Sequence, residues 1–254
     1  MSAANLSALV VAHDEEDNLE ACLSRLGFAG QIVVVLDRCT DRSREIALAA
    51  GAKILEGAWE LEGPRRNAGI AACDADWILE IDADERVPPA LAEEVLEAIR
   101  MAAPGYFLIK FDNYIGARLV RFGWGAYNGA SAGPRLFSKG AKIWGDQLIH
   151  PKIELMGERR RLNTPIEHYV DRNISDMIAR FDRYTTARAR DLVASGETGS
   201  LANNIRRLFS RFWKSYVTRR GYREGLYGLL LAMFSACYPL TAYIKARLEE
   251  GTGR

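Results

Sequence analysis

The chain has 254 residues, of which 48% are hydrophobic and 26% are charged. These proportions are typical of a folded globular protein and exclude a disordered one. The formal net charge of +1 gives no electrostatic argument for a nucleic-acid partner. Four cysteines without a CxxC pair argue against a zinc ribbon or a disulfide scaffold, and no basic segment marks a signal peptide. We therefore expect the catalytic part to stay in the cytoplasm.

Strands and helices alternate through the first hundred residues. Short apolar runs predict buried strands at 6–12, 31–37, 52–55 and 77–81. Helices are predicted at 19–26, 43–51, 65–72 and 89–101. This alternation indicates βαβ units and a parallel sheet, in which ligands bind beyond the carboxyl ends of the strands.

The pattern changes after about residue 105. Short segments interrupted by glycines predict strands and loops of a mixed sheet up to about residue 170, and the chain is predicted to be helical from about residue 174. The sequence thus predicts an α/β, Rossmann-like domain over residues 1–172 and a helical region over residues 173–254.

Two carboxylates follow the predicted strand at 77–81. In an extended segment Asp82 and Asp84 point to the same side, so both can face one cation. Oxygen ligands suit Mg²⁺ or Mn²⁺, and such an ion would neutralise a leaving diphosphate. The alternative is a solvated acidic turn, but the position after a buried strand favours the site.

Two further segments carry candidate ligands. Asp37 ends the strand at 31–37, where it can accept a hydrogen bond from a base or a ribose hydroxyl; capping of the next helix is the alternative. The segment GPRRNAG, residues 63–69, places arginines at a helix start, which suits a diphosphate. A basic surface turn is the alternative there.

In this order, these motifs resemble family 2 glycosyltransferases of the GT-A fold. The segments LSALVVAHDEEDNL, VVVLDRCTDRS, GPRRNAG and LEIDADERVPPAL carry the resemblance over about residues 5–100. Within the family, the chain is most similar to bacterial glucosyltransferases of the lipopolysaccharide-core type. The resemblance implies a nucleotide-sugar donor, inversion at the anomeric carbon, and a metal bound by Asp82, Asp84 and His168. The substrate-binding residues that we expect are Ala12, Asp14, Glu16, Asp37, Arg66, Asn67, Asp82, Ala83, Arg135 and His150.

The catalytic base is the point at which the sequence departs from this type. The segment RLFSKGAKIWGDQLIH resembles the family's catalytic region, but Pro151 stands where a glutamate is usual. The nearby carboxylates Asp146 and Glu154 are the candidates to replace it, and Asp146 is preferred. His168 could instead be structural.

The last third of the chain predicts membrane association. Residues 206–223 carry seven basic and no acidic residues, with apolar residues at helical spacing, which is typical of an amphipathic helix on an anionic membrane surface. The uncharged segment 225–244 is diluted by polar residues and Pro239, so a helix or broken pair half-buried in the interface is preferred over a membrane span. A helical appendage that packs on the domain or forms a homo-oligomer is the alternative.

These features predict a hexosyltransferase at the cytoplasmic face of the inner membrane, peripheral or monotopic. Its donor would be a UDP- or GDP-sugar, and its acceptor a lipid-linked or lipopolysaccharide-core saccharide. A polyprenyl-phosphate acceptor is one alternative, because an ionised phosphate needs no strong base. A non-catalytic membrane-bound nucleotide-binding scaffold and a cytosolic nucleotidyltransferase are the others.

Overall fold

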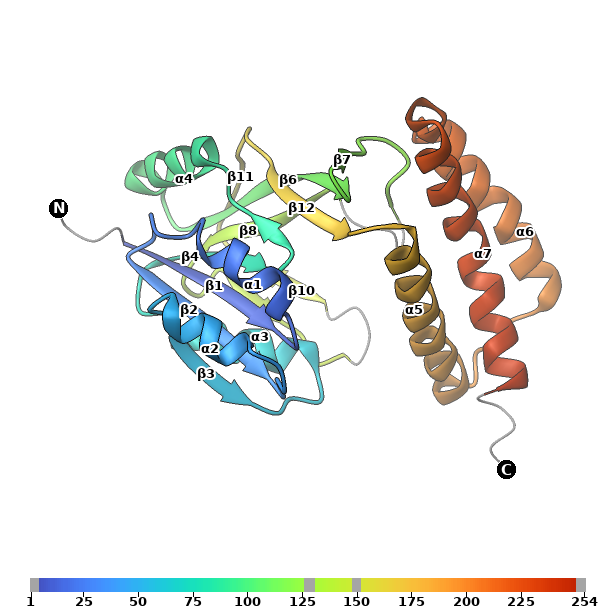
Figure 1. Cartoon of the computed structure of the whole chain (residues 1–254), viewed down its shortest axis with the longest axis horizontal. Helices are drawn as coiled ribbons and strands as arrows, with labels where there is room; N and C mark the ends of the chain where they lie inside the picture. The colour runs from blue at the N-terminus through green and yellow to red at the C-terminus, as the bar shows by residue number, and fades with distance from the viewer. Residues whose placement is uncertain (1–4, 126–130, 148–151, 250–254) are drawn as a thin grey trace. The chain divides into compact units, whose positions relative to one another are not determined.

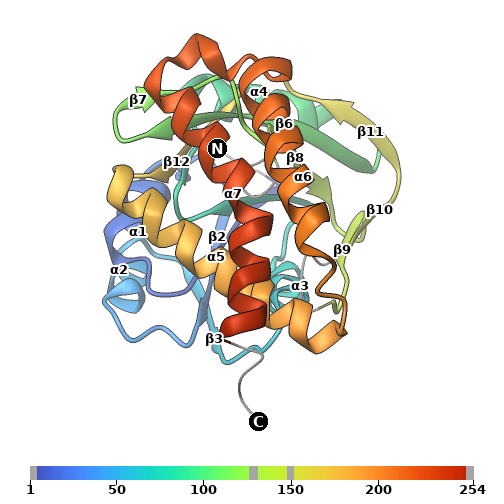
Figure 2. The same ribbon diagram turned by 90° about the vertical axis from the view of Figure 1, so that its right-hand side faces the viewer.

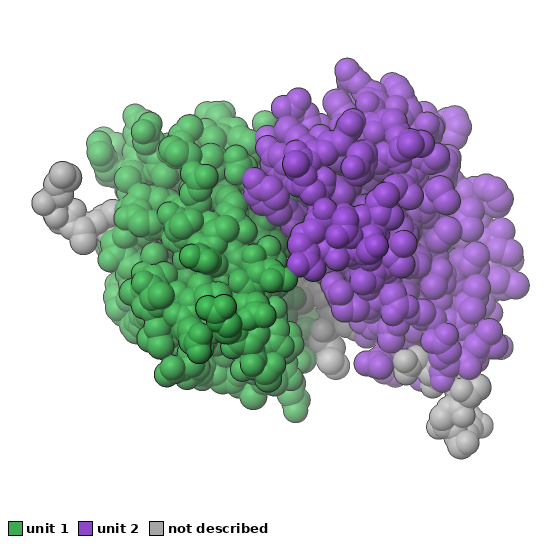
Figure 3. Space-filling view, viewed as in Figure 1, with its two compact units in different colours: residues 1–111, 132–168 green, residues 112–131, 169–254 purple. Residues whose placement is uncertain are grey.

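The computed structural model describes residues 5–125, 131–147 and 152–249. The chain forms two compact units, which Figure 3 shows in different colours. The first unit contains residues 1–111 and 132–168, and the second contains residues 112–131 and 169–254.

A mixed sheet with a parallel core organises the first unit. The parallel strands are β1 (Leu6–Ala12), β2 (Gln31–Asp37), β3 (Lys53–Gly57) and β4 (Trp77–Asp82). The sheet order is β3-β2-β1-β4-β8-β6-β12-β5, and β8 runs antiparallel to β4. The other strands are β5 (Glu85–Arg86), β6 (Gly105–Ile115), β7 (Arg118–Leu119), β8 (Ala132–Ser138), β11 (Glu158–Arg161) and β12 (Ile166–Asp171), with β9 (Lys142–Trp144) and β10 (Ile153–Leu155) in a separate pair. The predicted α/β fold with a mixed sheet is therefore confirmed.

Helices cover both faces of the parallel strands (Figure 1). The helices are α1 (Glu16–Leu23), α2 (Ser43–Ala49), α3 (Glu62–Ala72) and α4 (Pro89–Met101). Ala8 and Val10 of β1 pack in one cluster with residues of α1, α2 and α4, whereas Leu9 packs in another with Ile70 of α3. Burial on both faces explains why β1 and the buried part of β2 are apolar runs rather than alternating ones.

The second unit is built around three helices. They are α5 (Ile174–Ser195), α6 (Leu201–Trp213) and α7 (Leu226–Leu248), and a π-helical turn (Lys214–Thr218) and a 3₁₀ turn (Gly221–Glu224) connect the last two. α7 lies between α5 and α6 (Figures 1 and 2). The 3₁₀ turn approaches α7 closely because Gly228 of α7 carries no side chain: a Cβ there would lie 1.8 Å from the carbonyl oxygen of Gly221.

The helices differ from the predicted ones in one way. The basic stretch 206–223 is not one helix, because α6 ends at Trp213 and Arg220 adopts a left-handed φ of 57°. Of the two forms predicted for the apolar stretch, a helix or a broken pair, the structure has the single continuous helix, with Pro239 inside it. By length and composition, α7 is the one helix of the described residues that could cross a membrane, with a mean hydropathy of 1.4.

The second unit also includes residues that precede the helices in the sequence. Residues 112–125 belong with the helices because Val120 and Trp124 share a buried cluster with Met177 and Leu231. The buried Glu224 carboxylate accepts the backbone N–H groups of residues 121 and 122 at 2.8 and 3.1 Å. The second unit is therefore assembled from two separate segments of sequence.

Candidate functional site

The carboxyl end of β4 carries three acidic side chains. Asp82 is the last residue of β4, Asp84 lies in the following turn, and Glu85 begins β5. The side chains of Asp82 and Asp84 are 29% and 33% exposed, whereas Glu85 is fully buried. The Glu85 carboxylate accepts the backbone N–H of Asp82 at 3.0 Å, which fixes the turn. Burial raises the pKa of Glu85 to about 7, against the opposing charge of Arg135.

Two arginines hold Asp82. Arg66 from α3 donates to Oδ1 at 3.0 Å, and Arg135 from β8 donates to Oδ2 at 2.5 Å. Arg135 also donates to Glu85. Burial would raise the pKa of Asp82, but the charges of Arg135 and Arg66 outweigh it and hold the pKa far below its usual value. Asp82 is therefore ionised at every physiological pH.

A buried ion-pair network that was not predicted supports these arginines. Glu80 of β4 accepts from Arg66 at 2.6 Å and from Lys142 of β9 at 2.8 Å. Burial would raise the pKa of Glu80, but Lys142, Arg66 and Arg135 lower it to about 2. Glu80 and Asp82 are two residues apart in a strand and so share a side. A charged residue inside the otherwise apolar run WILEID was the available signal, because buried carboxylates are almost always paired.

His168 adds a nitrogen to the acidic strand end. β12 pairs antiparallel with β5, which places His168 opposite Glu85. Its Nε2 lies 3.3 Å from Oδ2 of Asp84. Burial would lower the pKa of His168, but the hydrogen bond to Asp84 and the charges of Asp84 and Glu85 raise it above its usual value. The structure thus places two of the predicted metal ligands, Asp84 and His168, against each other, whereas both oxygens of Asp82 face Arg66 and Arg135. The ligand atoms of the three predicted residues do not all lie within 4.8 Å of one another; among the described residues those of Asp14, Cys39 and Asp41 do.

Asp37 lies buried at the end of β2 and accepts four hydrogen bonds. Arg38 donates to both carboxylate oxygens at 3.0 Å, Arg65 to Oδ2 at 2.9 Å, and the Trp59 backbone N–H to Oδ1 at 3.1 Å. Burial would raise the pKa of Asp37, but these donors lower it. Arg38 adopts a left-handed φ of 52°, a strained conformation that clusters at functional sites. Arg65 therefore contacts Asp37, the residue predicted to bind the nucleotide, directly.

The predicted substrate residues of α3 face the protein interior. Arg66 bonds to Glu62, Glu80 and Asp82 and stacks over the Trp144 ring, with 4.8 Å to its centroid. The Asn67 side chain exchanges hydrogen bonds of 2.7 and 3.0 Å with the backbone of Trp144. In this structure both residues fix α3 against β9 and β4.

Acidic residues that follow β1 bind the backbone of the loop after β2. Asp14 adopts a left-handed φ of 53°, which aspartate tolerates better than most residues. Its Oδ1 accepts the backbone N–H groups of Thr40 and Asp41 at 2.7 and 3.3 Å, and Glu16 accepts from the N–H of Arg42 at 3.2 Å. The buried Ala12 and Ala83 end β1 and follow β4 at the same edge of the sheet.

The candidate bases lie on the β9–β10 segment. Asp146 is exposed in the loop after β9, and the exposed Glu154 pairs with Ile143 across the two strands. His150 and Pro151 lie outside the described residues. The choice between Asp146 and Glu154 therefore stays a prediction.

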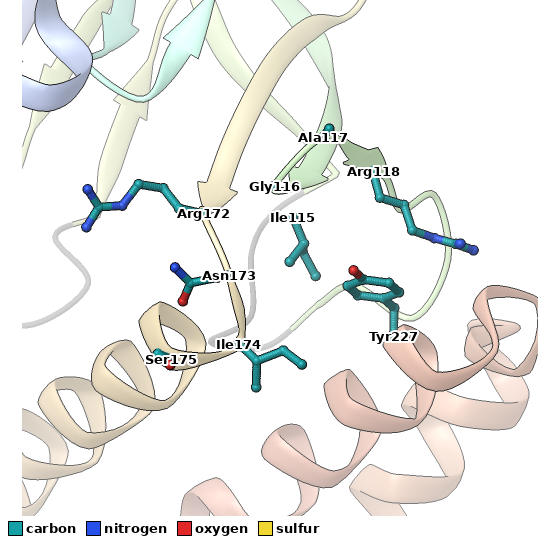
Figure 4. A pocket seen from close by; sticks show the side chains of 9 residues that line it. All are labelled: Ile115, Gly116, Ala117, Arg118, Arg172, Asn173, Ile174, Ser175 and Tyr227. Atoms are coloured by element: carbon teal, nitrogen blue, oxygen red, sulfur yellow. The ribbon is translucent and has the colours of Figure 1, made fainter.

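The second unit contains a cavity of about 830 Å³. Figure 4 shows Ile115, Ile174 and Tyr227 along it, with the side chains of Arg118 and Arg172 extending in opposite directions. Arg118 lies 3.7 Å from Glu224 and Arg172 lies 2.8 Å from Asp176, so acidic partners balance both positive charges. The cavity therefore offers no concentrated charge for an anionic ligand.

Comparison with known proteins matches the site-bearing segment to one family. Residues 7–129 fit the family model described as glycosyl transferase family 2. A glycosyltransferase of Rickettsia bellii is 24% identical over 248 residues, covering 91% of this chain and 82% of its own length. The lipopolysaccharide core biosynthesis glycosyltransferase LpsC of Rhizobium meliloti is 25% identical over 247 residues, covering 92% and 88%. Glucosyl-3-phosphoglycerate synthase of Mycobacterium tuberculosis, solved with Mn²⁺ and UDP, is 21% identical with a TM-score of 0.36, and the match spans 43% of this chain and 44% of that one.

The mixed sheet with its covering helices is GT-A-like. Residues 7–129 match the glycosyl transferase family 2 model, relatives that align over most of the chain are named glycosyltransferases, and the chain is a glycosyltransferase. The predicted family, the predicted fold and the similarity to lipopolysaccharide-core enzymes are thus confirmed.

Proposed function

We propose that this glycosyltransferase moves a hexose from a UDP- or GDP-sugar to a lipid-linked or lipopolysaccharide-core saccharide, with Mg²⁺ or Mn²⁺ and with inversion at the anomeric carbon. One observation carries the proposal: Asp84 and His168 lie 3.3 Å apart beside the ionised Asp82, at the carboxyl end of a parallel strand. Ligands bind at this edge of α/β sheets.

The side chains at this strand end are of the types that would bind a small divalent cation. Two partly exposed carboxylates and one imidazole offer mostly oxygen donors, which Mn²⁺ or Mg²⁺ prefers. Asp82 would turn from its arginines to join Asp84 and His168 on one ion. A bound cation would supply a Lewis acid that neutralises the leaving diphosphate. Arg66 and Arg135 keep Asp82 ionised and oriented, so no proton has to leave it before binding.

Asp37 would bind the nucleotide, but only after one of its present hydrogen-bond donors leaves. A carboxylate offers about four acceptor positions, and the protein's own donors already occupy all four. Arg38 supplies two of them from an exposed side chain on a strained backbone. Nucleotide binding would therefore displace Arg38, while Arg65 would stay to contact Asp37 and the diphosphate.

The remaining predicted residues would complete the substrate site. Ala12, Asp14, Glu16 and Ala83 would border the nucleotide, and His150 would line the acceptor site. Asp146 or Glu154 would remove the proton from the acceptor hydroxyl as it attacks. A lipopolysaccharide-core acceptor is supported by the similarity to LpsC, whose name assigns that pathway to it. The enzyme would work at the cytoplasmic face of the inner membrane, with its helical region on the anionic surface.

Transfer of labelled sugar tests the proposal. The full chain is incubated with UDP- or GDP-hexoses and Mn²⁺, and either core saccharide or polyprenyl phosphate as acceptor. We expect labelled core saccharide, and transfer at least about 100-fold lower in Asp84→Asn, because the site would lose one of its carboxylate ligands. The matched control Asp74→Asn removes an exposed aspartate whose pair with Lys53 stabilises little, and it should transfer normally. Labelling of polyprenyl phosphate alone would show that the acceptor is a polyprenyl phosphate and not a core saccharide. Full activity of Asp84→Asn would refute the role of this site.

A further inference from the structure

An apolar stripe runs along the exposed side of α6. We define the α6 stripe as Leu201, Ile205, Phe209, Trp213 and Val217, which recur every four residues through α6 and the π-helical turn. Side chains four residues apart are neighbours on a helix surface, and because each such step turns by about 40°, the row winds along the helix as a stripe. All five are between 36% and 69% exposed, with Phe209 and Trp213 the most exposed. Large apolar side chains in a contiguous exposed row mark an interaction surface.

Positive charge surrounds the stripe. Between Thr198 and Arg223 there is no acidic residue. The same stretch contains seven basic residues, namely Arg206, Arg207, Arg211, Lys214, Arg219, Arg220 and Arg223. Of these, Arg206, Lys214, Arg220 and Arg223 are exposed, on the helix or in the turns that follow it. A partner must therefore be apolar at the centre of its contact and negative at the edge.

The long apolar helix α7 is engaged inside its own unit. Its Phe234 packs against Phe181 of α5, with ring centroids 5.2 Å apart. Lys245, near its end, bonds to Asp182 and Thr186 of α5 at 2.6 and 2.7 Å. A membrane span through α7 would break these contacts. It would also expose to lipid the face of α7 that carries small buried residues such as Gly228, Ala232 and Ala236. α6 offers its stripe without any such loss.

We propose that the α6 stripe inserts into the interfacial layer of an anionic phospholipid membrane, while α7 stays packed between α5 and α6. This inference rests on the membrane location proposed above. Apolar and aromatic side chains would enter the acyl boundary, and the surrounding cations would contact lipid phosphates. A second copy of the chain fits less well, because pairing the stripe with itself would bring two such basic surfaces together.

Binding of the full chain to vesicles tests the proposal. We expect it to sediment with vesicles that contain phosphatidylglycerol and to bind phosphatidylcholine vesicles roughly 10-fold or more weakly, because each cation near an anionic surface adds affinity. The double variant Phe209→Ser/Trp213→Ser should bind anionic vesicles about 10-fold or more weakly. Its matched control is Ile178→Ser/Val193→Ser, which removes two exposed apolar side chains of α5 and should bind within about 2-fold of the native chain.

Three results would overturn the inference. They are unchanged vesicle binding by the stripe variant, equal binding to neutral and anionic vesicles, and resistance of the bound chain to carbonate extraction, which would indicate a span by α7. A native dimer that the stripe variant converts to a monomer, without a change in vesicle binding, would assign the stripe to a second copy instead. Nucleotide binding by the same variants separates this inference from the proposed activity, since the stripe variant should bind UDP or GDP as the native chain does.

Discussion

Arg135 on β8 donates to Oδ2 of Asp82 at 2.5 Å and also to the buried Glu85. One guanidinium thus sets the position of two carboxylates at the acidic strand end. Arg135→Lys keeps the charge but loses the planar group that reaches both, so we predict a fall in kcat/KM of about 10-fold or more. Steady-state kinetics with a saturating acceptor would measure it. An unchanged kcat/KM would show that Asp82 does not depend on Arg135.

The Glu80–Lys142 pair makes a prediction for stability. Lys142→Met leaves the fully buried Glu80 with one cation fewer, and loss of a buried partner costs about 3–5 kcal/mol. Urea denaturation should show this fall in the free energy of unfolding. Glu80→Gln/Lys142→Met should recover part of it, because no unbalanced carboxylate remains. A double variant as unstable as the sum of both single variants would contradict this coupling.

His168 should make metal binding pH-dependent. Its pKa is raised above the ordinary value of about 6.5, so protonated His168 contributes stability to the metal-free fold below that value and loses it as pH rises through the raised pKa. A metal needs the neutral imidazole, so its affinity should change in the opposite direction and increase with pH over this window. Titration of Mn²⁺ between about pH 6 and pH 8 would measure this slope.

The control for this pH dependence is His168→Gln. Glutamine cannot take up a proton in this range, so the variant should keep only the part of the slope that the titration of Glu85, with a pKa of about 7, contributes. An equal slope in both proteins would assign the pH dependence to another group.

Arg38 should oppose nucleotide binding. Arg38→Gly frees two acceptor positions on Asp37 and suits the left-handed φ of 52°, at which glycine is unstrained. We predict tighter UDP or GDP binding by about 3-fold or more, because the nucleotide no longer has to displace the arginine. Calorimetric titration would measure the dissociation constant. Weaker binding would instead identify Arg38 as a nucleotide ligand.

Most of the fold around the site was predictable because both faces of the parallel strands are buried. Strands buried in this way consist mainly of apolar residues, and the predicted strands at 6–12 and 31–37 agree with β1 and β2. The acidic end of β4 followed from its position after such a run. The role of Arg66 did not follow, because helical position alone does not tell whether its side chain faces solvent or the buried Glu80.

The second unit was less predictable, for two physical reasons. Its core includes residues from the segment 112–125, which is far from the helices in sequence. This segment has no periodic apolar pattern that predicts its packing against them. The composition of α7 also suits both a membrane-facing helix and a packed one, and only the contacts with α5 and α6 show the packing.

Metal-dependent nucleotide binding tests the central claim most directly. UDP and GDP are titrated into the native chain and into Asp84→Asn, each with and without Mn²⁺. We predict that Mn²⁺ tightens binding of one nucleotide by at least about 10-fold in the native chain, because Asp84 would hold the cation and its charge would offset that of the diphosphate. This gain should be absent in Asp84→Asn. Binding that neither Mn²⁺ nor the substitution changes would contradict a metal site at the end of β4.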